Sequence, residues 1–205
     1  MCSFIVSLAT VAAFLVPGSY PQADETAAYT VLDDGAAQLR EDFNRAKGSV
    51  RLLFVVDPIC PGCLRGLDDI NKALLGKTDD PRLQTFVVHV PVLGPEAKDV
   101  GPAAKLVQNS YVRHYWNPSG SFGWELTESA GLEDGAGEPV YAWDVWLIYG
   151  PEATWDGALP PQPRHLMHNL WALQDSEEFR RLDSEVLTQE VEQLLAQLPA
   201  ADSAQ

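Results

Sequence analysis

The feature that most constrains the fold is an apolar run that ends at an Asp-Pro pair and leads into two cysteines three positions apart. Residues 50–56 are rich in β-branched and large apolar side chains, which predicts a buried strand. Asp57 and Pro58 end this strand, because proline has no N–H to donate and disfavours helical dihedrals in the residue before it. The turn that follows holds Cys60, Pro61, Gly62 and Cys63.

The residues after this motif change to a helical period. Apolar side chains recur at intervals of three and four, at Leu64, Leu67, Ile70, Leu74 and Leu75, and Gly76 is the expected end of the helix. Cys60 then lies at a helix N-terminus, where free N–H groups and the helix dipole favour a thiolate. We therefore predict that Cys60 attacks a disulfide and that Cys63, one turn further on, resolves the mixed disulfide. Pro61 would stiffen the turn, and Gly62 would leave the sulfur unshielded.

The strand, Cys-x-x-Cys and helix together resemble the active site of the thioredoxin-like superfamily, and the order of elements from about Ala36 onward resembles that fold. The resemblance implies an α/β, three-layer thioredoxin-like fold with a mixed central sheet flanked by helices. It also implies a thiol:disulfide oxidoreductase that needs no cofactor and acts on protein thiols or disulfides, or on a redox partner protein. An additional helix, strand and helix resemble the insertion in exported proteins of the TlpA/ResA kind.

The remaining elements follow from apolar periodicity and from proline and glycine breaks. Strand 83–92 is continuously apolar, which predicts a sheet covered on both faces and parallel strands. The other expected elements are helix 36–47, helix 101–110, strand 111–116, helix 122–130, strand 140–149 with a short partner at 154–155, helix 164–173 and helix 176–198.

One position departs from the thioredoxin-like pattern. The family's cis-proline normally precedes the third core strand beside the active cysteines, whereas here Trp143 or Asp144 stands there and Pro139 comes too early. This leaves open whether substrates bind through the usual backbone pairing. If the alignment holds, the Asp144 carboxylate lies against Cys60 and disfavours a thiolate there.

Other interpretations of the motif remain open. The cysteines could form a structural disulfide, half of a metal site or an inert pair. Alternatively, the Cys60–Cys63 dithiol could bind a soft ion such as copper(I) or mercury(II), with Met167 or a histidine as third ligand. For His165 and His168 a structural or solvent-facing role is favoured. A peroxidase is a weaker hypothesis, because Pro58-Ile59-Cys60 replaces the usual Thr-x-x-Cys. Asp57 is either a proton acceptor or a strand-ending turn residue.

Composition limits the possible partners. The 205 residues fit one domain, and 29 acidic against 14 basic residues give a net charge of -15. Such a surface is a poor partner for nucleic acid or for anionic membranes. Three cysteines are too few for a disulfide-built scaffold, and two alone cannot complete a structural zinc site.

The N-terminal segment suggests export. Residues 2–16 are uncharged and apolar and are followed by Pro17-Gly18, which is typical of a signal core or a membrane anchor. We therefore expect residues 1–27 to be a signal-like or anchor segment of a periplasmic or otherwise extracytoplasmic protein. Contact with a membrane is expected only through this segment, if it is uncleaved. The expected division continues with a linker at 28–35, the thioredoxin-like domain at 36–199 and a disordered tail at 200–205.

Overall fold

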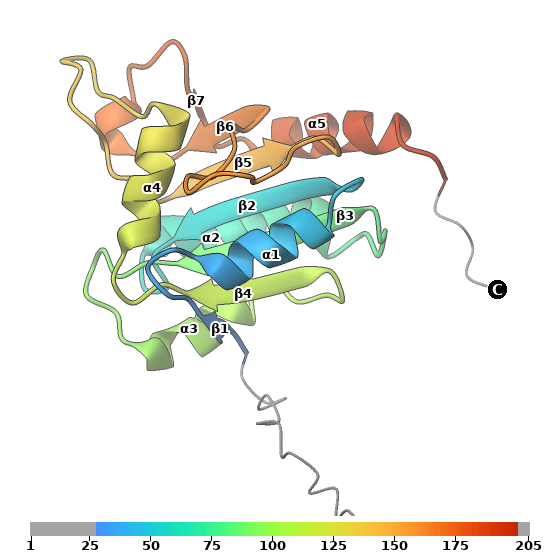
Figure 1. The fold of residues 1–205 in the computed structure, drawn as a ribbon, viewed down its shortest axis with the longest axis horizontal. Helices are drawn as coiled ribbons and strands as arrows, with labels where there is room; N and C mark the ends of the chain where they lie inside the picture. Colours follow the sequence, from blue (N-terminus) through green and yellow to red (C-terminus); the bar gives the residue numbers. More distant parts are fainter. Residues whose placement is uncertain (1–27, 201–205) are drawn as a thin grey trace, which may run out of the picture.

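The computed structural model describes residues 28–200, so the predictions for residues 1–27 and 201–205 lie outside it. The described residues form a mixed sheet with the strand order β1-β4-β3-β2-β5-β6-β7 (Figure 1). The strands are β1 (Thr30–Val31), β2 (Val50–Val56), β3 (Leu83–His89), β4 (Val112–Trp116), β5 (Val145–Tyr149), β6 (His165–His168) and β7 (Arg180–Arg181). The helices are α1 (Ala37–Arg45), α2 (Pro61–Ile70), α3 (Ala97–Ala104), α4 (Ser121–Ala130) and α5 (Ser184–Ala196).

Strand β2 lies at the centre of the sheet. All seven of its residues are buried, as its apolar run predicts. It pairs in parallel with β3 and antiparallel with β5, which in turn pairs antiparallel with β6. The parallel neighbour is reached through α2, because parallel strands need a crossover connection. The cysteine motif therefore lies at the C-terminal end of the central strand.

Helices cover both faces of the sheet, which makes three layers. Helices α1 and α4 pack on one face through Leu39, Phe43, Phe122 and Leu126. Helices α2 and α5 pack on the other face through Leu67, Ile70, Leu187 and Val191. Figure 1 shows α1 in front of the sheet and α2 behind it. The predicted three-layer α/β fold with a mixed sheet is confirmed.

The helix after the motif is longer than one regular α-helix. Helix α2 continues into a π-helical turn, η1 (Asn71–Leu75), and ends at Gly76 as predicted. Gly66 lies on the buried face of α2, where an added Cβ would be 2.5 Å from Cζ2 of Trp146. A side chain at this position is therefore excluded, and the helix approaches β5 closely.

The predicted insertion is present as α3, β4 and α4, with shifted boundaries. Helix α3 begins at Ala97 instead of residue 101, because Glu96 and Asp99 form a capping box at its start. Pro102 consequently lies inside the helix, which ends at Ala104. Strand β4 extends the sheet in parallel with β3, and α4 ends at Gly131 with a φ of 66°.

Several predictions for the C-terminal half are wrong. Residues 164–173 are not a helix: β6 pairs with β5, and only Trp171–Leu173 form a 3-10 turn, η2. Residues 154–155 are not the partner of β5, because β6 takes that place. The last helix begins at Ser184 instead of residue 176, where Asp183 accepts hydrogen bonds from the amides of Glu185 (3.0 Å) and Val186 (3.1 Å). The strand predicted at 140–149 begins only at Val145.

The region expected as a linker, residues 28–35, takes part in the fold. Thr30 and Val31 form β1, which pairs in parallel with β4 at the sheet edge. Leu32 is only 4% exposed and belongs to the core under α1 and α4. No helix in residues 28–200 combines the length and the apolar character that crossing a membrane requires.

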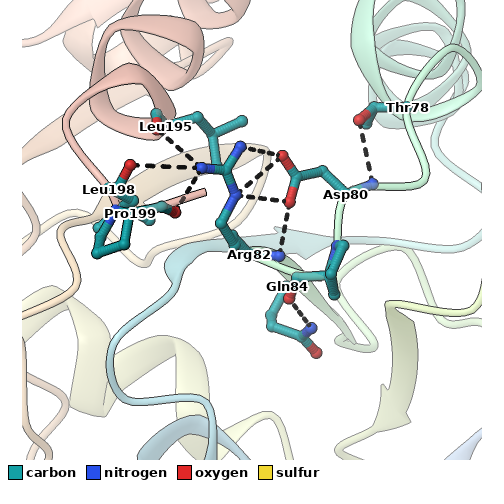
Figure 2. Close-up of polar contacts among 8 residues, drawn as sticks. Thr78, Asp80, Arg82, Gln84, Leu195, Leu198 and Pro199 are labelled. Carbon is teal, nitrogen blue, oxygen red and sulfur yellow. Dashed lines mark hydrogen bonds and ion pairs between the residues drawn. The ribbon is translucent and has the colours of Figure 1, made fainter. Parts of the chain in front are cut away.

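Arg82 fixes the end of α5 to the start of β3 (Figure 2). Its guanidinium donates to the carbonyls of Leu195 (3.4 Å), Leu198 (3.5 Å) and Pro199 (2.8 Å) at the C-terminal end of that helix. Asp80 holds the same guanidinium from the other side at 2.6 Å. A cation at a helix C-terminus satisfies carbonyls that have no partner within the helix.

Candidate functional site

The cysteine motif lies where β2 gives way to α2. Cys60 is the N-cap of α2 in an extended conformation, and Pro61 occupies the first helical turn, where its missing N–H costs nothing. The amide of Cys60 donates to the carbonyl of Asp57 at 3.2 Å, and the amide of Leu64 donates to the carbonyl of Cys60 at 3.0 Å. The structure therefore places Cys60 at the helix start that the sequence predicts.

The two cysteines are free thiols that differ in environment. Cys60 is 9% exposed, whereas Cys63 is completely buried. Burial, followed by the charge of Asp144, raises the pKa of the Cys63 thiol well above its ordinary value, and a main-chain hydrogen bond at Asp57 opposes that rise. Cys63 therefore remains protonated at neutral pH until a base takes its proton, and Cys60 is the more accessible of the two sulfurs.

Asp57 is buried at the end of β2 and holds the turn before the motif. One carboxylate oxygen accepts a hydrogen bond from the amide of Ile59 at 2.9 Å, and the other accepts one from the amide of Leu93 at 2.6 Å. Both oxygens are thus bound to main-chain donors, one in the motif turn and one in the loop after β3. This geometry fits a turn-fixing role better than proton transfer. Pro58 is also buried in this turn.

Asp144 lies beside both sulfur atoms. Its Oδ1 accepts hydrogen bonds from Nε1 of Trp146 and from Nδ2 of Asn169, each at 3.0 Å. The ligand atoms of Cys60, Cys63 and Asp144 all lie within 4.8 Å of one another, and the Asp144 side chain is buried. Its φ of 49° is unusual for a residue with a side chain, so the surrounding contacts hold it in a strained conformation.

Gly62 shows which way the other Asp144 oxygen points. A Cβ added to Gly62 would lie 3.2 Å from Oδ2 of Asp144 and 3.6 Å from Sγ of Cys60. The free carboxylate oxygen therefore faces the turn between the two cysteines. Within residues 28–200 no peptide bond is cis, so Asp144 occupies its place before β5 on a trans backbone.

A pocket of about 930 Å³ opens beside Cys60. Its walls come from α2, from the loop before β5, from the segment after β6 and from the first turn of α5. Trp143 is half-buried and lines this pocket, as does Trp171, which is 79% exposed. Both residues that the sequence suggested for the cis-proline position therefore lie near Cys60, Asp144 through its carboxylate and Trp143 in the pocket wall.

Sequence reasoning missed several residues of this pocket, among them Arg65, Tyr141, Asn169, Trp171 and Arg181. Arg65 could have been found, because it lies on the helix that the motif begins. The other residues carry no local signal, and those after residue 164 were assigned to helices in place of β6 and β7.

The histidines suggested as metal ligands are engaged elsewhere. Nε2 of His165 lies 3.3 Å from a carboxylate oxygen of Glu190. His168 accepts a hydrogen bond at Nδ1 from the amide of Leu170 (3.0 Å), and its Nε2 lies 3.2 Å from the carbonyl oxygen of Phe179. Met167 is buried in β6 on the sheet face that Cys63 also contacts. Among the described residues, Asp144 is the further acidic, histidine or cysteine side chain that lies close enough to both sulfurs to bind the same metal ion.

Comparisons with known proteins find solved structures that resemble this one, but no match by sequence. No protein-family model matches the sequence, and no curated protein matches it. Arabidopsis thaliana ScoI, solved with copper bound, has a TM-score of 0.46 at 13% identity over 75% of this chain and 88% of its own. A thioredoxin-family thiol:disulfide interchange protein from Chlorobium tepidum has a TM-score of 0.44 at 10% identity over 74% and 83%.

A secreted Mycobacterium tuberculosis disulfide oxidoreductase, described as homologous to E. coli DsbE, has a TM-score of 0.44 at 10% identity over 73% of this chain and 85% of its own. Likenesses this weak do not decide the fold or the chemistry. The fold is decided by the strand order β3-β2-β5-β6, with β5 antiparallel to its neighbours, and by the helices on both faces of the sheet. Cys60 and Cys63 lie at the start of the helix after the central strand. The chain has a thioredoxin-like fold with a Cys-x-x-Cys motif at the start of the helix that follows the central strand.

Proposed function

We propose that this protein is an exported thiol:disulfide oxidoreductase that exchanges protein thiols and disulfides through Cys60 and Cys63. The observation that carries the proposal is the asymmetry of the pair. Cys60 is a helix N-cap at the edge of a pocket, whereas Cys63 is fully buried with a raised pKa. Such an arrangement supplies one attacking sulfur and one sulfur that acts only after the first has reacted.

The reaction proceeds in two exchanges. The Cys60 thiolate attacks one sulfur of a substrate disulfide, the substrate S–S bond breaks, and one substrate thiolate leaves. Cys63 then loses its proton and attacks Sγ of Cys60, which releases the second substrate thiolate and leaves a Cys60–Cys63 disulfide. The reverse sequence oxidises a substrate dithiol. Asp144, within 4.8 Å of both sulfurs, can accept the Cys63 proton directly or through one water.

Export is the part of the proposal that rests on the sequence. Residues 2–16 form an uncharged apolar stretch before Pro17-Gly18, as signal cores do. An oxidising compartment suits a protein whose chemistry is thiol–disulfide exchange. Fusing residues 1–27 to a reporter enzyme that folds only outside the cytoplasm tests this part separately, and a reporter that stays inactive contradicts it.

The test of the exchange chemistry uses the separate roles of the two sulfurs. Cys63→Ser should accumulate a mixed disulfide between Cys60 and a protein substrate such as insulin, detected on a non-reducing gel. Cys60→Ser should abolish both the mixed disulfide and the acceleration of insulin reduction by dithiothreitol. Cys2→Ser is the matched control, because it removes a cysteine that lies outside the motif. Faster alkylation of Cys63 than of Cys60 at neutral pH would contradict the assignment.

A second candidate function is metal binding by the same dithiol, favoured by the grouping of Cys60, Cys63 and Asp144. The third donor is then a carboxylate oxygen instead of the methionine or histidine that the sequence suggested. Two thiolates and one carboxylate suit zinc better than copper(I), which prefers sulfur ligands. Titration of the reduced protein with zinc, copper(I) and mercury(II) separates these possibilities. Tight binding without any insulin activity would favour the metal-binding function.

A further inference from the structure

Three side chains that can bind a metal converge beside the motif turn. The ligand atoms of Cys60, Cys63 and Asp144 lie within 4.8 Å of one another, and all three residues are buried. Two sulfurs bound to one tetrahedral zinc ion are about 3.8 Å apart, because each Zn–S bond is about 2.3 Å long. Small rotations of these side chains therefore bring the three donors onto one ion.

The Asp144 carboxylate is held as metal-binding carboxylates are. Its Oδ1 accepts hydrogen bonds from Nε1 of Trp146 and from Nδ2 of Asn169, each at 3.0 Å. These bonds leave Oδ2 on the side of the turn between the two cysteines. Hydrogen bonds from surrounding residues orient a ligating carboxylate and add to its affinity for the metal.

One side of this group is open to the pocket beside Cys60. Cys60 and Asp144 both line that pocket, so an ion and a fourth ligand can reach the group from there. Three protein ligands with an open fourth position are a common arrangement for zinc. The acidic side chains of the pocket wall outnumber the basic ones, and its charges therefore favour a cation over an anion. They are Asp69, Asp144, Asp183 and Glu185 against Arg65 and Arg181.

The donor set favours zinc over other metal ions. Magnesium and calcium prefer ligand sets made of oxygen alone, and copper(I) prefers sulfur. Zinc accepts cysteine sulfur and aspartate oxygen in the same site. The combination of two thiolates and one carboxylate therefore points to zinc.

Gly62 keeps the space beside two of the donors free. A Cβ at this position would lie 3.2 Å from Oδ2 of Asp144 and 3.6 Å from Sγ of Cys60. The methyl group of an alanine would thus contact both donor atoms and hinder the rotations that bring them onto one ion. Gly62→Ala therefore tests the site without removing a ligand.

We propose that Cys60, Cys63 and Asp144 form a zinc site that regulates disulfide exchange. This inference rests on the proposed thiol–disulfide exchange and names how the same site is controlled. Zinc binding displaces the thiol protons, and the bound Cys60 sulfur then has the ion in place of a substrate disulfide. Oxidation has the opposite effect, because the sulfurs of a Cys60–Cys63 disulfide are no longer thiolate ligands.

The cycle balances with zinc, protons and the substrate disulfide alone. The reduced dithiol binds Zn²⁺ and releases its thiol protons. After the ion dissociates, Cys60 attacks the substrate disulfide, the substrate S–S bond breaks, and Cys63 displaces the second substrate thiolate. The protein dithiol loses two electrons and becomes a disulfide, and the substrate gains them and becomes two thiols. Zinc keeps its oxidation state throughout.

The first test measures metal binding by the reduced full chain with Cys2→Ser, in which Cys60 and Cys63 are the remaining cysteines. Cobalt(II) is the probe, because its absorption reports thiolate ligands and tetrahedral geometry, and zinc should displace it. Asp144→Asn and Gly62→Ala should each weaken zinc binding about tenfold or more, although both keep the two cysteines.

Each of these variants has a matched control. Glu185→Gln removes another carboxylate of the pocket, and Gly101→Ala adds a Cβ that meets no atom within 4 Å. Both controls should bind zinc as tightly as the parent chain. Equal zinc affinities in Asp144→Asn and Glu185→Gln would overturn the three-ligand site, and binding of copper(I) but not of zinc would overturn the choice of ion.

The second test measures exchange with bis(2-hydroxyethyl) disulfide, a neutral probe. The loss of free thiol is followed in the metal-free reduced chain, with zinc, and with zinc followed by EDTA. With free zinc at about ten times its Kd, thiol loss should slow about tenfold, because only the metal-free fraction reacts, and EDTA should restore the rate. A zinc-sensitive dye should show the ion leaving as the thiols are oxidised.

The outcomes separate this inference from the function on which it rests. If the metal-free chain does not react with the disulfide, the exchange chemistry fails, and the regulation fails with it. If the metal-free chain reacts but zinc neither slows thiol loss nor leaves on oxidation, exchange stands and the zinc regulation is wrong. Slower exchange with zinc, restored by EDTA and weakened in Gly62→Ala, supports both.

Discussion

Nε1 of Trp146 donates a hydrogen bond of 3.0 Å to Oδ1 of Asp144, two residues earlier in the chain. The indole is completely buried between β5 and α2, so it holds the carboxylate from the core side. Nδ2 of Asn169 donates to the same oxygen. The position before β5 thus carries a buried carboxyl group beside the cysteines, held by two hydrogen bonds.

Removing the Asp144 charge should change the pKa of Cys63. In Asp144→Asn, the amide oxygen can still accept from Trp146, but the charge that raises the pKa of the Cys63 thiol is gone. We expect the pKa of Cys63 to fall, and a lower pKa favours oxidation because the thiol loses its proton more easily. The same substitution also removes the nearby carboxylate that could accept this proton. Thiolate absorbance against pH, measured in a Cys2→Ser, Cys60→Ser background, reports this pKa directly.

A matched control for that experiment is Glu185→Gln. Glu185 is an exposed carboxylate that lines the same pocket but is not grouped with the sulfurs. It should leave the pKa of Cys63 unchanged. An identical titration for Asp144→Asn and the unsubstituted background would show that Asp144 does not influence Cys63 in solution.

The close approach of α2 and β5 should make Gly66 intolerant of any side chain. Gly66→Ala would place a Cβ 2.5 Å from the buried indole of Trp146, which has to move and would disturb its bond to Asp144. We expect a loss of about 1–3 kcal/mol in the free energy of unfolding, typical of overpacking. Gly101→Ala in α3 is the control, because its Cβ would meet no atom within 4 Å. Equal stabilities of the two variants in urea would contradict this expectation.

The part of the fold around the cysteine motif could be predicted because its signals are local. The apolar run of β2, the Asp57-Pro58 break and the period of α2 each determine their own element, and all three lie where the sequence places them. Asp144 could be placed near the cysteines because it directly precedes the strand Val145–Tyr149, which is buried throughout.

The C-terminal half could not be predicted because its strands are set by pairing. His165–His168 is a four-residue segment whose apolar pattern fits a helix or a strand, and contact with β5 decides between them. Strand β7 has only two residues, both arginine, which carry no strand signal. The same limit hid most of the pocket, because its outer wall is built from this segment.

A pair of buried histidines, His89 and His114, lies on β3 and β4. Nε2 of His89 is 3.2 Å from Nδ1 of His114, and Nε2 of His114 is 2.9 Å from the carbonyl oxygen of Val107. Because a carbonyl only accepts, His114 carries its proton on Nε2, and its Nδ1 accepts from Nε2–H of His89. Both rings are therefore neutral, and burial lowers the pKa of His89 to about 3 and also lowers the pKa of His114.

These histidines should make the protein sensitive to acid. The unfolded chain binds protons on histidine below about pH 6.5, whereas folded His89 does so only near pH 3. Stability should therefore fall as the pH drops from 6.5 toward 3, with a loss from His89 of about 2 kcal/mol at pH 5. Urea unfolding of the protein and of a His89→Leu, His114→Leu variant at pH 7 and pH 5 measures this. An equal pH dependence in both would assign the acid sensitivity to other groups.

The segment expected as a linker should contribute to stability through one side chain. Leu32 is 4% exposed in the core, and its amide donates to the carbonyl of Trp116 at 2.8 Å. Leu32→Ala should cost about 2–3 kcal/mol, as for other buried leucines. Val31→Ala, at a residue 60% exposed, should change the free energy of unfolding little. Similar urea midpoints for the two variants would return residues 28–35 to the role of a linker.

The outermost strands of the sheet, β1 and β7, have two residues each. A sheet edge is a template on which another chain can add a strand, and long exposed edges lead to aggregation. Here each edge strand presents only a few main-chain groups. In β7 these groups belong to Arg180 and Arg181, whose positive charges repel the same edge of a second copy. The described domain should therefore stay dispersed at high protein concentration.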